Sequence, residues 1–239
     1  MKDINNQYNQ RIVKILCPHC SYLCSPQMTH CTKCGETLPH DPKILRSNSK
    51  FSISKSYPYK NKVLKSIEQR INKLIPLKNE LKQNDIGYIE SNGEITDLSL
   101  FKCHLEHFPE EILKLTSLRI LMLRRNIITQ LPSNIAFLSN LNLLDLRINK
   151  IEYLPKSIGF MTNLKYLNIS SNIMKSLPSS IGNLKSLEYI NLSNNRLLSI
   201  PESIGNLTSL KELNLKANFW IKIPKAVKNL EKKGLQIIL

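Results

Sequence analysis

The chain has 239 residues, 41% of them hydrophobic, so it can bury a sizeable core and is not a disordered tail. Its apolar runs are far shorter than the about 18 residues needed to cross a bilayer, and residues 1–16 are polar and lack a cleavage site. These features predict no membrane span and no secretory signal, and they favour a cytoplasmic location. The formal net charge of +16 suggests an anionic partner, but Lys, Asn and Ile are all abundant, as A/T-rich codons would produce, so the charge alone identifies none.

Two cysteine pairs near the amino terminus have the spacing of a metal site. The sequence reads C-P-H-C at residues 17–20 and C-T-K-C at residues 31–34. Each C-x-x-C knuckle brings two thiolates to one side of a tight turn, and four thiolates at about 2.3 Å form a closed tetrahedral Zn²⁺ site. We therefore expect one structural zinc ion and no zinc catalysis. The expected ligands are Cys17, Cys20, Cys31 and Cys34.

The C-P-x-C and C-x-x-C-G motifs, followed by Leu38-Pro39, resemble the short zinc-ribbon modules of archaeal and bacterial proteins. We assign residues 1–40 to such a zinc ribbon. Disulfides are the alternative, but they need an oxidising compartment, and the five cysteines of this segment cannot all pair. Cys24, His19 or His30 could replace a ligand, but His19 lies inside a knuckle and Cys24 breaks the two-knuckle spacing. So short a segment buries too little surface to fold unaided, and zinc would supply about 10 to 16 kcal/mol.

Residues 41–60 are rich in serine and lysine and have few apolar anchors, which predicts a flexible linker. Residues 61–94 are expected to cap the repeats that follow. Apolar residues keep helical spacing from Asn61 to Pro76, where the proline ends or kinks the helix. Next, Asn92-Gly93 separates two strand-like runs and can supply the positive φ angles of a type I′ hairpin. The hairpin would place an antiparallel neighbour beside the first strand of the repeats.

Six of the 12 prolines lie 23 residues apart, at positions 109, 132, 155, 178, 201 and 224, so residues 95–232 are six copies of one repeat. Each unit reads L-x-x-L-x-L-x-x-N-x-L-x-x-L-P-x-x-I-x-x-L-x-x, where L and I stand for apolar residues, and every inward position is apolar. The segment L-x-x-L-x-L predicts a short parallel strand with alternate side chains inside the coil. The segment after the proline predicts a helical or 3₁₀ back face, so the expected fold class is an α/β solenoid.

The asparagine of each unit is expected to turn the chain, because its amide can satisfy backbone groups where the strand bends away. Stacked copies would form a ladder of Asn126, Asn149, Asn172, Asn195 and Asn218. In the first unit Cys103 takes this slot, which predicts a buried thiol.

After the last unit, residues 233–239 leave the repeat phase and are expected to form a C-terminal cap. In this cap Leu235, Ile237, Ile238 and Leu239 would complete the core. Trp220 stands where other units have an aliphatic side chain, and we interpret it as core packing in a wider terminal coil.

The repeat resembles the leucine-rich repeat family. Its L-P-x-x-I-G-x-L form is most similar to the intracellular 23-residue class of Ras-interacting and plant Ras-group-related proteins, over residues 95 to about 230. This resemblance implies a horseshoe with short parallel strands that serves as a binding scaffold. It also implies a role in signal transduction, with a small GTPase as one candidate partner.

Strand residues between the core leucines should face the concave surface, and aligning the units gives the candidate binding residues. They form a contiguous apolar and aromatic strip beside two arginines: Ile120, Met122, Leu143, Tyr166, Tyr189, Arg124 and Arg147. Arg and Tyr are common interface anchors, and adjacency distinguishes the strip from the isolated apolar residues of ordinary surfaces. Six strands offer a footprint near 300 Å², whereas a standard protein interface needs about 800 Å² per side. The partner must therefore be a peptide or extend onto the flanking loops or the zinc ribbon.

Two functions compete, and a third hypothesis is a subunit of a larger enzyme assembly such as a ligase or kinase complex. The first is a non-enzymatic adaptor that binds a protein or peptide on the concave face. The second is a nucleic-acid-binding protein that uses the zinc ribbon and the basic surface, although the ribbon does not alternate basic and aromatic residues. Catalysis is not expected, because Cys103 fills a buried turn slot, His104 and His107 fall in exposed loop positions, and no phosphate-binding G-x-x-x-x-G-K-[ST] loop occurs.

Overall fold

The computed structural model describes residues 15–16, 23–24, 61–219 and 221–239. The chain divides into two units, Met1–Asn61 and Lys62–Leu239. In the first unit, β1 (Ile15–Leu16) pairs antiparallel with β2 (Leu23–Cys24), and Ile15 lies opposite Cys24. The four expected zinc ligands, the expected linker 41–60 and Trp220 lie outside the described residues. No helix in the described ranges is long and apolar enough to cross a membrane.

The second unit begins with a cap. Helix α1 (Lys62–Ile71) buries one face through Leu64 and Ile67. Strands β3 (Ile86–Ser91) and β4 (Glu94–Leu100) then form an antiparallel hairpin whose turn has φ of 54° at Asn92 and 81° at Gly93, as the Asn-Gly pair predicted. The outer edge of β3 is covered as well, because Tyr88 donates to the carbonyl of Pro76 and accepts from the N–H of Lys78.

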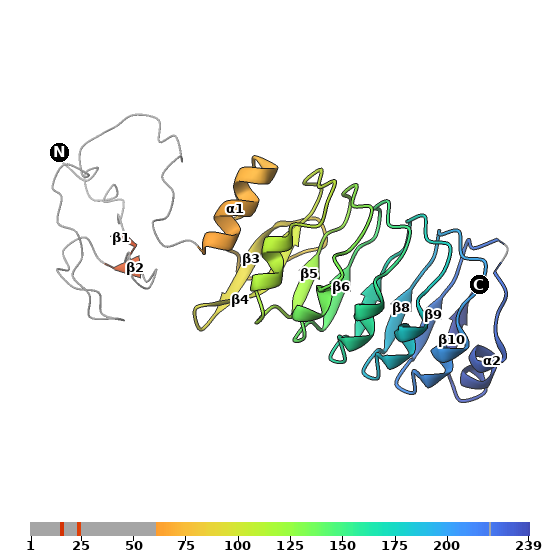
Figure 1. Ribbon diagram of the computed structural model, residues 1–239. Helices are drawn as coiled ribbons and strands as arrows, with labels where there is room; N and C mark the ends of the chain where they lie inside the picture. Colours follow the sequence, from red (N-terminus) through yellow and green to blue (C-terminus); the bar gives the residue numbers. More distant parts are fainter. Residues whose placement is uncertain (1–14, 17–22, 25–60, 220) are drawn as a thin grey trace, which may run out of the picture. The chain divides into compact units, whose positions relative to one another are not determined.

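From β4 onward the strands are parallel and form one sheet (Figure 1) with the order β10-β9-β8-β7-β6-β5-β4-β3. The central strands are β5 (Ile120–Met122), β6 (Leu143–Asp145), β7 (Tyr166–Asn168), β8 (Tyr189–Asn191) and β9 (Glu212–Asn214). They pair with one register throughout, so residues one repeat apart lie side by side across neighbouring strands. The sequence predicted this solenoid of short parallel strands.

The back of each coil is a short helix (Figure 1). These are η2 (Glu110–Lys114), η3 (Ile135–Phe137), η4 (Lys156–Phe160), η5 (Ser179–Asn183), η6 (Glu202–Asn206) and α2 (Lys225–Glu231). Proline precedes all of them except η3, because its fixed φ suits the residue before a helix and its missing N–H costs no bond there. Glycine allows adjacent coils to approach closely on this side: a Cβ at Gly182 would lie 2.2 Å from the carbonyl oxygen of Ser203.

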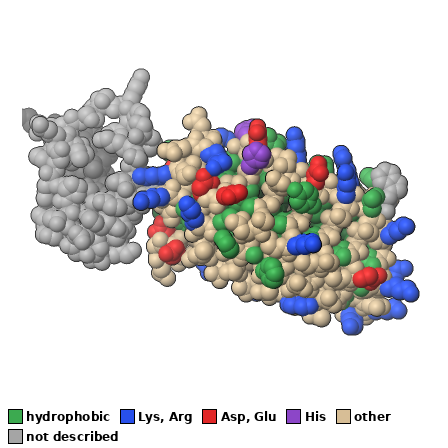
Figure 2. All heavy atoms as spheres, in the orientation of Figure 1, with side chains coloured by type: hydrophobic (Ala, Val, Ile, Leu, Met, Phe, Trp, Pro, Cys, Tyr) green, Lys and Arg blue, Asp and Glu red, His purple; other side chains and the backbone are tan. Residues whose placement is uncertain are grey.

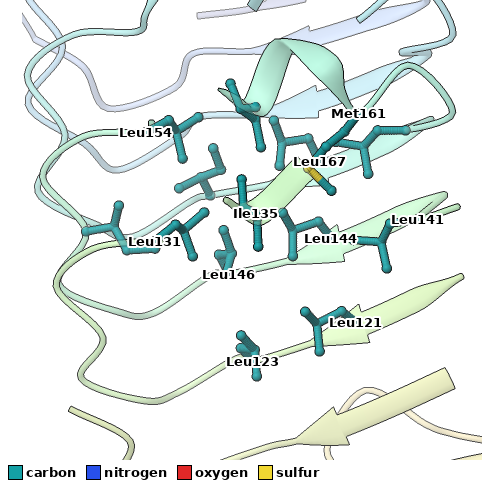
Figure 3. Packing of buried hydrophobic residues seen from close by; sticks show 14 of the residues in the cluster. Leu121, Leu123, Leu131, Ile135, Leu141, Leu144, Leu146, Leu154, Met161 and Leu167 are labelled. Atoms are coloured by element: carbon teal, nitrogen blue, oxygen red, sulfur yellow. The ribbon is translucent and has the colours of Figure 1, made fainter. Parts of the chain in front are cut away.

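The core consists of aliphatic rows between the sheet and the back helices (Figure 3). Leu121, Leu144 and Leu167 are stacked on successive strands and are at most 1% exposed. Each row is continuous from coil to coil, so every coil covers the apolar surface of its neighbours. A single coil could not bury these side chains alone.

The buried asparagines bind successive coils together. In Asn172, Oδ1 accepts from the N–H of Ile151, and Nδ2 donates to the carbonyls of Leu146 and Ile169. Equivalent bonds recur at the other four asparagines, which confirms the predicted ladder. The residue before each slot has positive φ, including Ile148 at 58°. Cys103, in the first slot, is buried as predicted and donates its own N–H to Asn126 Oδ1.

The carboxyl-terminal segment differs from its expected role as a cap. Residues Gln236–Ile238 form a further strand, β10, that pairs parallel with β9. Leu235 is buried as expected, but Ile237 and Ile238 are only half-buried and Leu239 is 73% exposed. The prediction that Leu239 completes the core was therefore wrong, because a strand at the edge of the sheet has no next coil to cover it.

Candidate binding face

The side of strands β4–β10 that lies opposite the back helices, which we call the strand face, holds the candidate binding residues. Alternate strand residues point to this side, because successive side chains of a strand alternate between faces. The most regular feature is an aromatic pair: the rings of Tyr166 and Tyr189 stack with centroids 4.8 Å apart and planes within 3°. The register of β7 and β8 sets this distance by placing the two tyrosines opposite each other.

A groove of about 270 Å³ surrounds this pair. Its outward-facing lining includes Leu143, Asp145, Arg147, Tyr166, Tyr189 and Glu212. The structure therefore brings together four of the seven residues that the sequence nominated, one each from β6, β7 and β8 and one from the loop after β6.

Arg147 is held in place by a carboxylate of its own repeat. Its Nε lies 2.9 Å from Asp145 Oδ2 and its Nη2 lies 2.7 Å from the same oxygen, while Asp145 Oδ1 also accepts from the backbone N–H of Arg147. Asp145 is 4% exposed, so the ion pair is largely removed from water. The two charges thus neutralise each other within the chain. Arg147 lines the groove in a fixed orientation and adds little net charge to it.

Arg124 is placed differently. Its Nη1 donates to Asn84 Oδ1 at 2.8 Å, and its guanidinium lies 5.9 Å from the ring centroid of Phe101. It forms no ion pair within the described part of the second unit. Burial lowers the pKa of the Arg124 guanidinium, and the nearby positive charge of Arg147 lowers this pKa further. Arg124 is therefore a half-buried, oriented cation without an anionic partner of its own.

A row of asparagines runs along the strand face next to the tyrosines. In Asn168 and Asn191, Oδ1 accepts both the backbone N–H and the hydroxyl of the serine two residues later, and in Asn214 Oδ1 accepts the backbone N–H of Lys216. Because each Oδ1 already accepts a hydrogen bond from the chain, Nδ2 is the group of each amide that can bind a partner. They make no hydrogen bond to the chain within the described ranges.

The remaining three predicted residues lie outside the groove, and one prediction needs correction. Met122 was expected in the exposed strip, but it is only 8% exposed, between the buried Ser99 and Asp145 on the neighbouring strands. Loop residues before β3 cover this end of the face: Ser99 Oγ donates to the backbone carbonyl of Asp85, and Arg124 Nη1 donates to the side-chain Oδ1 of Asn84. The strand face is therefore partly covered at β4 and β5 and open from β6 to β9.

The repeat pattern alone did not identify Asp145 and the asparagine row as parts of the site, although they occupy adjacent places in the aligned repeats. Their roles depend on bonds to the residue two positions later, and the recurring pattern of Asn or Asp, then any residue, then Ser, Arg or Lys was the available signal.

Charged groups outside the groove are mostly basic (Figure 2). Lys225, Lys228, Lys232 and Lys233 are exposed in and after α2. Figure 2 shows blue Lys and Arg side chains gathered at the carboxyl-terminal end of the solenoid. Beside the tyrosines, Lys211 pairs with Glu188 and lies 5.9 Å from the ring centroid of Tyr189. The hydrogen bond from Lys211 lowers the pKa of Glu188, so this carboxylate is ionised at neutral pH.

Cys103, His104 and His107 are the residues whose chemistry could suggest catalysis. Burial raises the pKa of the Cys103 thiol to about 11, so it is protonated at neutral pH and a poor nucleophile. His104 and His107 are exposed. In the described residues no group of three His, Cys, Asp or Glu side chains could hold a metal ion.

Stacked parallel coils with an aliphatic core, an asparagine ladder and one open sheet face define a solenoid of the leucine-rich repeat type. A family model of the leucine-rich repeat region matches residues 94–188 and 156–233. The chain therefore belongs to the leucine-rich repeat family. No curated protein matches it in a sequence search.

Several solved structures are similar. A leucine-rich repeat protein of Leptospira interrogans is 33% identical with a TM-score of 0.58, over 73% of this chain and 45% of that one. The Arabidopsis receptor kinase HAESA, solved with the peptide hormone IDA and the co-receptor SERK1, is 32% identical with a TM-score of 0.58, over 74% of this chain and 30% of that one. The ectodomain of the Arabidopsis thaliana receptor kinase GASSHO1/SCHENGEN3, solved with CASPARIAN STRIP INTEGRITY FACTOR 2, is 30% identical with a TM-score of 0.52, over 59% and 18%. The chain spans less than half the length of each of these proteins.

Proposed function

We propose that the protein is a non-enzymatic adaptor whose strand face binds a protein or peptide partner. The observation that carries this proposal is the groove around the stacked pair of Tyr166, which is exposed, and Tyr189, which is half-buried; Leu143 and the fixed Arg147 line the same groove. Stacked tyrosines and ordered arginines are common anchors of interfaces, because they supply large contact areas at little cost in side-chain entropy. The peptide in the HAESA complex and the protein-interaction role of similar repeats support this proposal.

The size of the open face favours a narrow partner. The groove of about 270 Å³ lies near the lower end of volumes found for ligand sites, and loop residues already cover β4 and β5. A globular partner would therefore need further contacts outside the strand face, whereas an extended segment fits within it. A small GTPase in cytoplasmic signalling is the candidate for the larger kind of partner, and this part of the proposal rests on the resemblance of the repeat consensus alone.

A photo-crosslinking experiment tests the strand-face assignment. A benzophenone amino acid replaces Leu143 on the strand face or Phe160 on the back, where Phe160 is 71% exposed. Crosslinked protein or peptide partners are expected only from position 143 in nuclease-treated lysate. The double variant Tyr166→Ala/Tyr189→Ala should abolish these crosslinks without changing the melting temperature, whereas Phe160→Ala should preserve them. Equal crosslinking from both positions would contradict the proposal, and crosslinks that disappear after nuclease treatment would favour the nucleic-acid alternative.

We also propose that the amino-terminal unit holds one structural zinc ion through Cys17, Cys20, Cys31 and Cys34. These ligands lie outside the described residues, but the antiparallel strands β1 and β2 flank the first C-x-x-C motif, as expected of a ribbon hairpin. Metal analysis of the purified chain should give one zinc per molecule. Cys31→Ser should abolish tight zinc binding, whereas Cys24→Ser should retain it. A metal-free wild-type chain purified without chelator would overturn this assignment.

A further inference from the structure

The chemistry of the strand face is asymmetric from one end to the other. Near the amino-terminal coils, Arg124 forms no ion pair with a carboxylate of the described residues, although the charge of Asp145 acts on it from beyond contact distance. Toward the other end of the strand face, Glu212 lines the groove and forms no ion pair within residues 61–219 and 221–239. The Arg147–Asp145 ion pair lies between them and is already satisfied. An anionic group of a partner is therefore attracted to Arg124 and repelled by Glu212.

The region between the two charges offers hydrogen-bond donors and apolar surface. The amide groups of Asn168 and Asn191 present only Nδ2 to a partner, because Oδ1 is bound to the chain. The rings of Tyr166 and Tyr189 provide the apolar platform beside them. Donors of this kind match main-chain carbonyl oxygens, which an extended segment presents along its length.

The spacing of these features sets the length of the segment. Arg124 and Tyr166 are two strands apart, about 10 Å, and four residues apart in the strand direction, about 13 Å. The diagonal distance is about 16 Å, which about five residues of extended chain cover. Phe101 and Asn84 hold the guanidinium at its end of this path, so little side-chain entropy is lost when it binds an anion.

We propose that the strand face binds an extended acidic peptide segment of a partner protein. A carboxylate side chain of this segment pairs with Arg124, and an apolar or aromatic side chain about five residues away packs on Tyr166 and Tyr189. This inference rests on the proposed function, because it names the partner chemistry of the same face.

Peptide selection with the full chain tests the inference. A library of random twelve-residue peptides displayed on phage is selected on the wild-type protein, and enriched sequences are synthesised and titrated by fluorescence anisotropy. We expect an Asp or Glu about five positions from an aromatic or aliphatic residue. Arg124→Gln should weaken binding of such a peptide by about ten- to a hundredfold, because a charge-assisted hydrogen bond is lost. Replacing the acidic residue of the peptide by its amide should have the same effect, and the two changes together should cost little more than one.

Matched variants separate this effect from general electrostatics. Arg196→Gln removes the same charge at an exposed position of another coil and should change the affinity less than twofold. Glu212→Gln should raise the affinity for the acidic peptide, because it removes a negative charge from the groove wall. Thermal unfolding of each variant confirms that the fold is retained.

The outcomes distinguish the two proposals. Enriched peptides that lose binding in Tyr166→Ala but contain no acidic residue would overturn the acidic-peptide inference and leave the strand-face function intact. Peptides that bind Tyr166→Ala and Arg124→Gln as well as wild type, or no enrichment at all, would overturn both. The last test is competition with a twenty-nucleotide single-stranded DNA. If this DNA displaces the selected peptide completely at about 0.15 M salt, and more weakly at higher salt, the strand face binds nucleic acid and the acidic-peptide inference is wrong.

Discussion

Replacing Asn172 by alanine should destabilise the coil by an amount that the hydrogen bonds allow us to work out. The Asn172 side chain is buried at 7% exposure, and its Oδ1 is the acceptor for the N–H of Ile151 at 2.9 Å. Its Nδ2 donates to the carbonyls of Leu146 and Ile169, but each of these carbonyls also accepts from a neighbouring asparagine of the ladder. The substitution therefore leaves one group, the N–H of Ile151, without a side-chain acceptor, and weakens two others.

The expected cost follows from these three groups. A buried donor left unpaired costs about 1 to 3 kcal/mol. Each lost hydrogen bond to a carbonyl that keeps another donor costs about 0.5 to 1.5 kcal/mol. Asn172→Ala should therefore lower the free energy of unfolding by about 2 to 6 kcal/mol, a large fraction of the typical total of about 5 to 15 kcal/mol. Asn172→Asp should be at least as harmful, because it keeps the acceptor but places a negative charge against two carbonyl oxygens. Asn172→Cys should cost less than either, because Cys103 occupies the equivalent slot of the first coil.

Urea unfolding followed by circular dichroism measures these differences, with the slope of the transition checked for constancy among variants. Asn183→Ala is the matched control, because Asn183 is exposed at the end of η5 and its side chain makes no hydrogen bond among the described residues. If Asn172→Ala and Asn183→Ala unfold within about 0.5 kcal/mol of each other, the ladder does not stabilise the coil and the reasoning is wrong.

Three further predictions concern the spacing, the backbone and the cap. Gly182→Ala should lower the free energy of unfolding by about 2 kcal/mol, because the new Cβ would meet the backbone of Ser203, and an unchanged urea midpoint would contradict the close approach. Ile148→Asn should raise the free energy of unfolding by about 1 kcal/mol, because Ile148 has a positive φ of 58°, which asparagine tolerates better than a β-branched residue, and its side chain is 37% exposed. A lower urea midpoint would contradict this prediction. Burial opposes ionisation of Glu111, but hydrogen bonds from its own backbone N–H, from Arg70 and from Ser66 outweigh burial and lower its pKa. Ionised Glu111 therefore stabilises the docking of α1 at pH values above the pKa of the unfolded chain. This stabilisation is lost as the pH falls through the lower pKa of the folded state. The protection factors of the α1 amides, which are exchange rates corrected for the intrinsic effect of pH, should therefore fall in acid in the wild type. In Glu111→Gln they should be lower already at pH 7 and depend less on pH.

The sequence alone predicted those parts of the fold that depend on local periodicity. A period of 23 residues with a fixed apolar pattern allows one arrangement of inward and outward side chains, and each coil repeats it against an equal neighbour. The buried leucines, the asparagine ladder, the buried Cys103 and the Asn92-Gly93 turn are therefore all as predicted.

The accessibility of the outward residues could not be predicted in the same way. Met122 and Tyr166 occupy outward positions of the same repeat pattern, yet Met122 is 8% exposed and Tyr166 is 43% exposed. The difference arises because the loop before β3, distant in sequence, contacts Ser99 and Arg124 at one end of the face only. No periodic signal reports such a contact.

The sequence by itself determined that six equal coils stack with their aliphatic side chains inside, because a repeated local pattern is satisfied by the same contacts in every coil. Only the tertiary structure decided which part of the strand face is open, that Asp145 neutralises Arg147 while Arg124 lacks such a partner, and that the last residues add the strand β10. These features depend on side chains and loops that meet across coils or at the ends of the sheet, where the repeat no longer supplies an identical neighbour.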